Sequence, residues 1–177
     1  PKLHEDFETS QSQMDDGLWR LYGPRTKTVV EKIEKRAPFT LENLVDSFQG
    51  IITGNDKAFI FDDDELAAYN FNPRFLHPWI KNRNVHAFEI TPPVKQILYT
   101  NEIEAIEKHP YEEVYLKQFR EKLTSRRECK NGRLPWYAIQ WGRNPECFMK
   151  KKIIFPYKAK DNRFAIDELS LIHISEP

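Results

Sequence analysis

The spacing of apolar and polar residues predicts an amphipathic helix near the start of the chain. Val29, Val30, Ile33 and Ala37 fall on one face of a 3.6-residue repeat. Pro38 follows them, and a proline ends a helix because it has no N–H to donate and its ring crowds the preceding turn.

A second helix is predicted over residues 41–48. Its apolar positions recur at i, i+3, i+4 and i+7, and they are Leu41, Leu44, Val45 and Phe48. Thr40 is a residue type that caps helix N-termini, and Gly50 stands where the helix would end.

Further along the chain, helix and strand patterns follow one another. Pro110 begins a predicted helix that carries Tyr115, Leu116, Phe119 and Leu123 on one face. Short apolar runs predict strands at residues 58–61, 96–99, 152–155 and 164–166. We therefore expect an α+β fold in which residues 1–167 form a single mixed helix and strand domain.

Composition favours a soluble globular protein. The chain has 177 residues, of which 13% are aromatic and 31% charged, enough for both a core and a hydrated surface. No run approaches the ~20 apolar residues that span a bilayer, and the first residues contain no apolar signal core. We expect a cytoplasmic location.

No metal site is predicted. Cys129 and Cys147 have neither C-x-x-C spacing nor a nearby histidine pair, so we expect ordinary thiols. The run Asp62, Asp63 and Asp64 lacks the glycine and glutamate spacing of a calcium loop.

Positive charge is concentrated in one part of the chain, although the formal net charge is zero. Residues 1–107 hold 12 Lys and Arg against 18 Asp and Glu, whereas residues 108–163 hold 15 against 6. Such a block attracts a polyanion if it forms one face of the fold. The alternative is that these side chains only solvate the surface.

The glycine-flanked segment Gly50–Phe61 has the composition of an anion-binding loop. Its glycines allow close approach of another backbone, while Thr53, Asn55 and Lys57 offer a hydroxyl, an amide and a cation to a phosphate or a base edge. A purely structural turn before a strand is the alternative.

Residues 72–85 mix aromatic side chains with cations and amides, as nucleic-acid surfaces do. We assign Phe75 and Trp79 to packing and keep Lys81 and Arg83 as candidates for DNA contact. Arg126 is a further candidate, although its place at the end of the predicted helix also suits the helix dipole.

Several short motifs occur in the order found in one known family. They are Trp19, the G-I-x-T-G-x-x-x-A-F loop at residues 50–59, the cationic segment 80–85, His109-Pro110, Tyr115-Leu116-x-x-Phe119 with Leu123 and Arg126, Trp136-Tyr137, and Lys152-Ile153-Ile154-Phe155-Pro156. In this order the chain resembles the TaqI-like C-terminal specificity domain, the target-recognition part of adenine-specific DNA methyltransferases and fused type II restriction-modification enzymes. Asn82 stands where the family has a glycine, and Ile52 adds bulk beside Gly50.

The resemblance implies a division of labour between two domains. A separate catalytic domain binds S-adenosylmethionine and methylates adenine N6, while the part resembled here docks on double-stranded DNA and selects the target sequence. This chain has no glycine-rich cofactor loop after a strand and no Asn-Pro-Pro-Tyr motif for a flipped adenine. We therefore expect no catalytic residue and no cofactor in this segment, and a methyltransferase domain of the same parent chain as its partner.

DNA binding is expected to use phosphate contacts for position and base contacts for sequence. The predicted phosphate contacts are Lys57, Lys81, Arg126, Lys151 and Lys152, and the predicted base contacts are Thr53, Asn55, Arg83 and Arg143. The predicted core includes Trp19, Phe48, Phe59, Trp136, Tyr137 and Phe155.

Two other classes of function stay open at this stage. Glu128-Cys129-Lys130 has the Glu-x-Lys spacing that can hold a cation in a metal-dependent endonuclease. Alternatively, Trp136, Tyr137 and Trp141 form the hydrophobic patch of a protein-interaction module.

Residues 168–177 do not continue the family pattern. We expect them to be a non-native tail on a truncated fragment, with sheet edges left exposed and a lower stability than that of the parent enzyme.

Overall fold

The computed structural model describes residues 22–91 and 95–173. The chain divides into two compact units, Pro1–Phe48 and Gln49–Pro177. Trp19, which we assigned to the core, lies outside the described residues.

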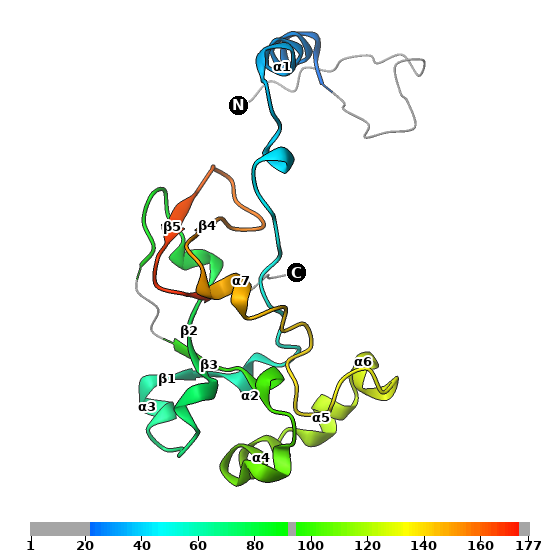
Figure 1. Cartoon of the computed structure of the whole chain (residues 1–177), viewed down its shortest axis with the longest axis vertical. Helices are drawn as coiled ribbons and strands as arrows, with labels where there is room; N and C mark the ends of the chain where they lie inside the picture. Colours follow the sequence, from blue (N-terminus) through cyan, green and yellow to red (C-terminus); the bar gives the residue numbers. More distant parts are fainter. Residues whose placement is uncertain (1–21, 92–94, 174–177) are drawn as a thin grey trace, which may run out of the picture. The chain divides into compact units, whose positions relative to one another are not determined.

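The described part of the first unit contains one regular helix, α1 (Pro24–Arg36), as the periodicity predicted (Figure 1). Pro24 is at the first helical position, where its missing N–H costs nothing. No residue of α1 is buried.

The predicted helix over residues 41–48 is wrong. Only a single 3-10 turn forms, η2 (Leu41–Asn43), in which Asn43 accepts hydrogen bonds from the backbone and hydroxyl of Thr40. Phe48, predicted in the core, is exposed. A helical pattern this short needs a packing surface to be stable, and the apolar side chains Leu41, Leu44 and Val45 are exposed and not buried against the core.

A four-stranded sheet is the centre of the second unit. Its strands are β1 (Ile60–Asp62), β2 (Leu76–Ile80), β3 (Lys95–Leu98) and β6 (Ile172–His173), in the order β1-β3-β2-β6. β3 pairs antiparallel with both β1 and β2, whereas β6 runs parallel to β2. The predicted strand at 96–99 is confirmed within one residue.

The second unit also contains short helices. They are α2 (Asp56–Phe59), α3 (Asp63–Leu66), α4 (Pro110–Lys117), α5 (Arg120–Thr124), α6 (Arg127–Lys130) and α7 (Glu146–Met149). Single 3-10 turns lie between them: η3 (Pro73–Phe75), η4 (Asn82–Asn84), η5 (Thr100–Glu102) and η6 (Ile106–Lys108). Of the helices, α2 and α3 contact β1. The combination of helices and sheet agrees with the expected α+β class.

The long helix predicted after Pro110 is interrupted. Phe119 has φ −105° and ψ 2°, and it separates α4 from α5. The apolar face is nevertheless the predicted one, since Tyr115, Leu116 and Leu123 are buried in the main core. Phe59 and Tyr137 belong to the same core, and Trp136 packs against it, as predicted.

A separate two-stranded ribbon is formed by β4 (Lys152–Ile154) and β5 (Ala165–Asp167). One face is buried in a second, smaller core, where Ile154 and Ala165 pack with Ile80, Val85 and Leu171. The opposite face is apolar but open to solvent, and its side chains are Ile153, Phe155, Phe164 and Ile166. The core assignment of Phe155 is therefore wrong, because strand alternation points it outward.

A buried ion pair joins the two strands of the ribbon. The ammonium group of Lys152 contacts the carboxylate of Asp167, with side chains 8% and 0% exposed, and also donates to the carbonyl of Phe148 at 2.6 Å. Asp167 in turn accepts the backbone N–H groups of Leu169 and Leu171 at 2.8 and 2.9 Å.

Part of the segment that we expected to be a tail packs onto the fold. Leu171 and Ile172 are buried, and Ile172 pairs with Trp79 of β2. The foreign origin of residues 168–177 stays a prediction. In the described part of the chain, no helix has the length and apolar character that crossing a bilayer requires.

Lys152→Ala should destabilise the second unit by about 3 kcal/mol, because it leaves the Asp167 carboxylate buried without its partner cation. Lys151→Ala is the matched control one residue away. Its Nζ lies 2.5 Å from Glu168, but both side chains are mostly exposed, so its loss should cost less than about 1 kcal/mol. Urea unfolding measures the free energy of unfolding of both variants. An equal loss in the two would contradict the conclusion that the Lys152–Asp167 pair is buried and stabilising.

Candidate nucleic-acid interface

The glycine-flanked loop is built into the body of the second unit. Thr53 is 2% and Asn55 8% exposed. The Thr53 hydroxyl donates to Asp56 at 2.5 Å and accepts the Asn55 backbone N–H at 3.2 Å. This internal network holds the turn before α2, so the structural-turn alternative describes these two residues, and neither presents its side chain as a base contact.

Gly54 has a physical reason to be glycine. Its φ is +74°, in the left-handed region, and an added Cβ would lie 2.6 Å from Oε1 of Gln140 and 3.1 Å from Cδ of Arg126. Gln140 is held in place because its amide donates to Glu128 Oε2 at 3.1 Å. The glycine allows close packing within the protein here.

Arg126 fixes the same loop from the other side. Its guanidinium donates to the carbonyls of Leu123, Thr53 and Trp136 at 2.8, 3.3 and 2.8 Å. Burial lowers the pKa of this guanidinium, since the surrounding protein solvates the charge less well than water. Arg126 therefore joins three chain segments, and its assignment as a phosphate contact is corrected.

The assignment of Lys152 as a phosphate contact is also corrected, because its ammonium group is paired with the buried Asp167 carboxylate. Its neighbour Lys151 stays on the surface beside Glu168. A lysine run in the sequence thus contains a buried structural cation next to an exposed cation that pairs with a surface carboxylate.

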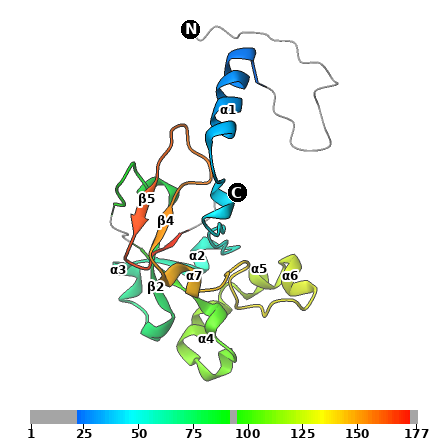
Figure 2. The same ribbon diagram turned by 45° about the horizontal axis from the view of Figure 1, so that its top comes forward.

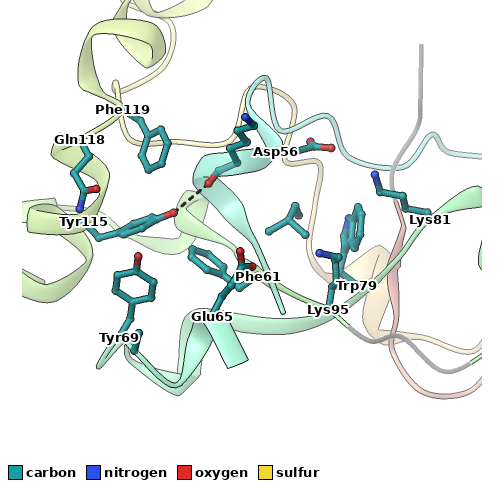
Figure 3. Close-up of a pocket in the computed structure, with 13 residues that line it drawn as sticks. Asp56, Phe61, Glu65, Tyr69, Trp79, Lys81, Lys95, Tyr115, Gln118 and Phe119 are labelled. Carbon is teal, nitrogen blue, oxygen red and sulfur yellow. Dashed lines mark hydrogen bonds between the residues drawn. The ribbon is translucent and has the colours of Figure 1, made fainter. Parts of the chain in front are cut away.

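Lys57 and Lys81 line an open groove of about 680 Å³ in the second unit (Figure 3). Lys81 and Lys95 lie on either side of the Trp79 indole, and Tyr69, Tyr115 and Phe119 form the other end. The Lys81 ammonium is 5.4 Å from the Trp79 ring centroid.

The charges of this groove nearly cancel. Asp56 and Glu65 line it together with the lysines, and Lys95 is paired with Asp62 at 2.6 Å. The groove can hold an aromatic or amphipathic group, but it has no strong preference for an anion.

Arg143 is presented by a strained turn. It has φ +63°, and its guanidinium lies 5.6 Å from the Trp141 ring and donates to Gln49 Oε1 at 2.9 Å. Tyr99 fixes this turn by donating to the carbonyls of Gly142 and Arg143, and burial raises the pKa of Tyr99 to about 12. Arg143 stays exposed, as a base contact would need to be.

The cationic block of residues 108–163 does not form one continuous face. Most of its exposed members lie on or next to the helices α4 to α6, or on the β4–β5 ribbon and the residues just before it, and these two parts lie apart in both views (Figures 1 and 2). Arg143 lies in the turn before α7. The single cationic surface that the sequence suggested is therefore corrected to separate groups.

The ribbon group combines unpaired cations with exposed aromatic rings. Lys158, Lys160 and Arg163 form no salt bridge with a described residue, and Lys158 lies 5.8 Å from the Tyr157 ring centroid. The Phe155 and Phe164 rings pack 5.6 Å apart on the open face. None of these residues except Phe155 was assigned a role from the sequence, although the three cations and three aromatic residues within 155–164, after a run of three lysines, were a visible signal.

No protein-family model matches this chain.

The described residues do not bring together the groups on which the endonuclease and protein-interaction alternatives were based. Glu128 is partly buried and bonded to Gln140, and the described residues contain no group of three or more His, Cys, Asp or Glu side chains that could hold a metal ion. Tyr137 is buried, and Trp136 packs on the core under Arg120, so only Trp141 of the proposed aromatic patch is exposed.

Gly54→Ala should destabilise the second unit by about 2–3 kcal/mol, from the strained backbone and the overpacking against Gln140 and Arg126. Gly132→Ala is the matched control, because Gly132 has φ +69° but no atom within 4 Å of an added Cβ. The free energy of unfolding of the Gly132→Ala variant should fall by only about 1 kcal/mol, the cost of placing alanine in the left-handed backbone region. Equal losses in urea unfolding would show that the loop is not packed in this way.

Proposed function

We propose that the second unit docks on double-stranded DNA as the sequence-recognition part of a site-specific adenine-N6 methyltransferase. The resemblance to TaqI-like specificity domains supports this assignment, and the catalytic and S-adenosylmethionine-binding functions then belong to a domain outside these residues. Lys57, Lys81, Arg83, Arg143 and Lys151 remain the candidates for DNA contact from the sequence.

One observation carries the proposal, namely the side chains around the open face of the β4–β5 ribbon. Between residues 150 and 168 there are six cations and three carboxylates, and two of these carboxylates are paired with Lys151 and Lys152. The cations left over are Lys150, Lys158, Lys160 and Arg163, and the same stretch of chain carries the exposed rings of Phe155, Tyr157 and Phe164, which can contact bases or sugars. A two-stranded ribbon also has the width that the DNA major groove admits.

DNA binding should weaken steeply with salt, with log affinity falling by about 0.9 per phosphate contacted for each tenfold rise in salt. The double variant Lys158→Gln and Lys160→Gln should bind more weakly and reduce this slope by about two. A fluorescence-anisotropy titration of a duplex at several salt concentrations measures both quantities.

The matched control is Lys122→Gln with Lys130→Gln, which removes the same charge from α5 and α6. It should change the slope less than the ribbon variant does. Equal effects would show that only overall charge matters, and a chain that binds no duplex at low salt would contradict the proposed function.

Arg83→Ala should relax sequence preference at one base pair, because a guanidinium can discriminate bases by paired hydrogen bonds worth about 1–3 kcal/mol. Lys151→Ala should weaken binding to all sequences about equally, since an ammonium group mainly supplies charge. Competition among a randomised pool of duplexes separates the two patterns. An unchanged sequence profile for the Arg83 variant would remove it from the base contacts.

A further inference from the structure

The loop between β2 and β3 presents one aromatic side chain to solvent in an unusual way. Phe88 is 95% exposed, more than any other large apolar side chain of the described residues. Its backbone has φ +66°, a conformation that is strained for a bulky residue. An exposed phenylalanine ring and a strained backbone both lower the stability of the folded state, so a contribution to stability does not account for this conformation of Phe88.

The loop that carries Phe88 is firmly held. Val85 and Ile90 form an antiparallel bridge, and the His86 N–H donates to the Glu89 carbonyl at 2.8 Å, which places Ala87 and Phe88 at the tip. At the base of the loop, the Thr91 N–H donates to the Asn84 carbonyl at 2.9 Å. These bonds leave the Phe88 ring little freedom to fold back onto the protein.

The same loop is attached to the β4–β5 ribbon. The Phe88 N–H donates to the Phe164 carbonyl at 2.8 Å, and Val85 and Ile90 pack into the second core beneath Ile154 and Ala165. The loop stands beside β5 in both overall views (Figures 1 and 2). The backbone of Phe88 thus lies beside that of Phe164, one of the residues of the open apolar face.

The charges around this face favour a nucleic acid as its occupant. Arg83, Lys158, Lys160 and Arg163 adjoin it along the chain and lack salt bridges to described residues, whereas its nearby carboxylates are Glu89 and Asp161. An exposed ring in the same part of the fold as these cations suits duplex DNA, in which stacked bases lie between two phosphate chains. Apolar side chains that enter such a stack unstack one base step and bend the helix.

We propose that Phe88 is a wedge that inserts between base pairs of duplex DNA, while the ribbon cations hold the flanking phosphates. This inference rests on the proposed docking of the second unit on DNA. It adds that the unit deforms the duplex and thereby prefers flexible pyrimidine–purine steps, at which unstacking is easiest.

The test uses the full chain and duplexes of about 20 bp, each with one 2-aminopurine beside a TA or CA step. Unstacking of this base raises its fluorescence. The unmodified chain should raise the fluorescence on binding, and Phe88→Gly should abolish this rise and weaken binding about tenfold. Phe88→Leu should retain part of the rise, because leucine also serves as a wedge.

Phe88→Gly also separates a functional role from a structural one. Glycine relieves the positive φ, so the variant should unfold at an equal or higher urea concentration than the unmodified chain while losing the unstacking signal. The control is Tyr111→Ala, which removes an exposed aromatic ring from α4 and should leave fluorescence and affinity unchanged.

Each outcome decides between the claims. Absence of any duplex binding at low salt would overturn the proposed function and the wedge together. Duplex binding without a fluorescence rise, or with an equal rise in the Phe88→Gly variant, would overturn the wedge alone. Phe88-dependent binding to vesicles of phosphatidylserine and phosphatidylcholine, without duplex binding, would replace the DNA wedge with a lipid contact.

Discussion

The β4–β5 ribbon buries one of its two faces, and the second core determines which face that is. Ile154 and Ala165 are buried against Ile80 and Val85. The ion pair between Lys152 and Asp167 joins β4 and β5 at the neighbouring position of the register. Because side chains alternate along a strand, every neighbouring apolar residue is then forced outward. The open apolar face is the direct consequence of this packing.

The same small core fixes the loop that carries Phe88. Val85 is 1% exposed, and its burial positions the bridge to Ile90 on which the tip depends. The loop and the ribbon are therefore joined by a shared core and by the hydrogen bond from Phe88 to the Phe164 carbonyl. Groups that are held in place before binding lose less conformational freedom in a complex than groups that binding must order.

The sequence predicted elements well where a long pattern or a proline defined them, as for α1, β3 and the start of α4. It failed where a pattern was short. The run Ala58–Phe61 was predicted as a strand, yet its first half completes α2, because four apolar residues fit a buried turn of helix as well as a strand. The periodic residues 41–48 did not form the predicted helix, since periodicity alone supplies no surface to pack against.

The site was harder to predict because the roles of charged groups depend on distant partners. Arg126 is bonded to a carbonyl 73 residues away, and Lys152 to a carboxylate 15 residues away, and neither partner is visible in a local motif. Phe88 was missed for another reason. Nothing in the order of residues shows that a phenylalanine will adopt a positive φ, which tertiary contacts impose at the tip of the loop.

Amide hydrogen exchange of the full chain with and without duplex DNA, at low salt, tests the account most directly. We expect added protection in residues 83–90 and 153–166, with little change in the α5–α6 segment and in the buried loop at 50–56. Protection confined to α5 and α6, or no protection anywhere, would contradict the conclusion that the ribbon and its attached loop are the surface that meets DNA.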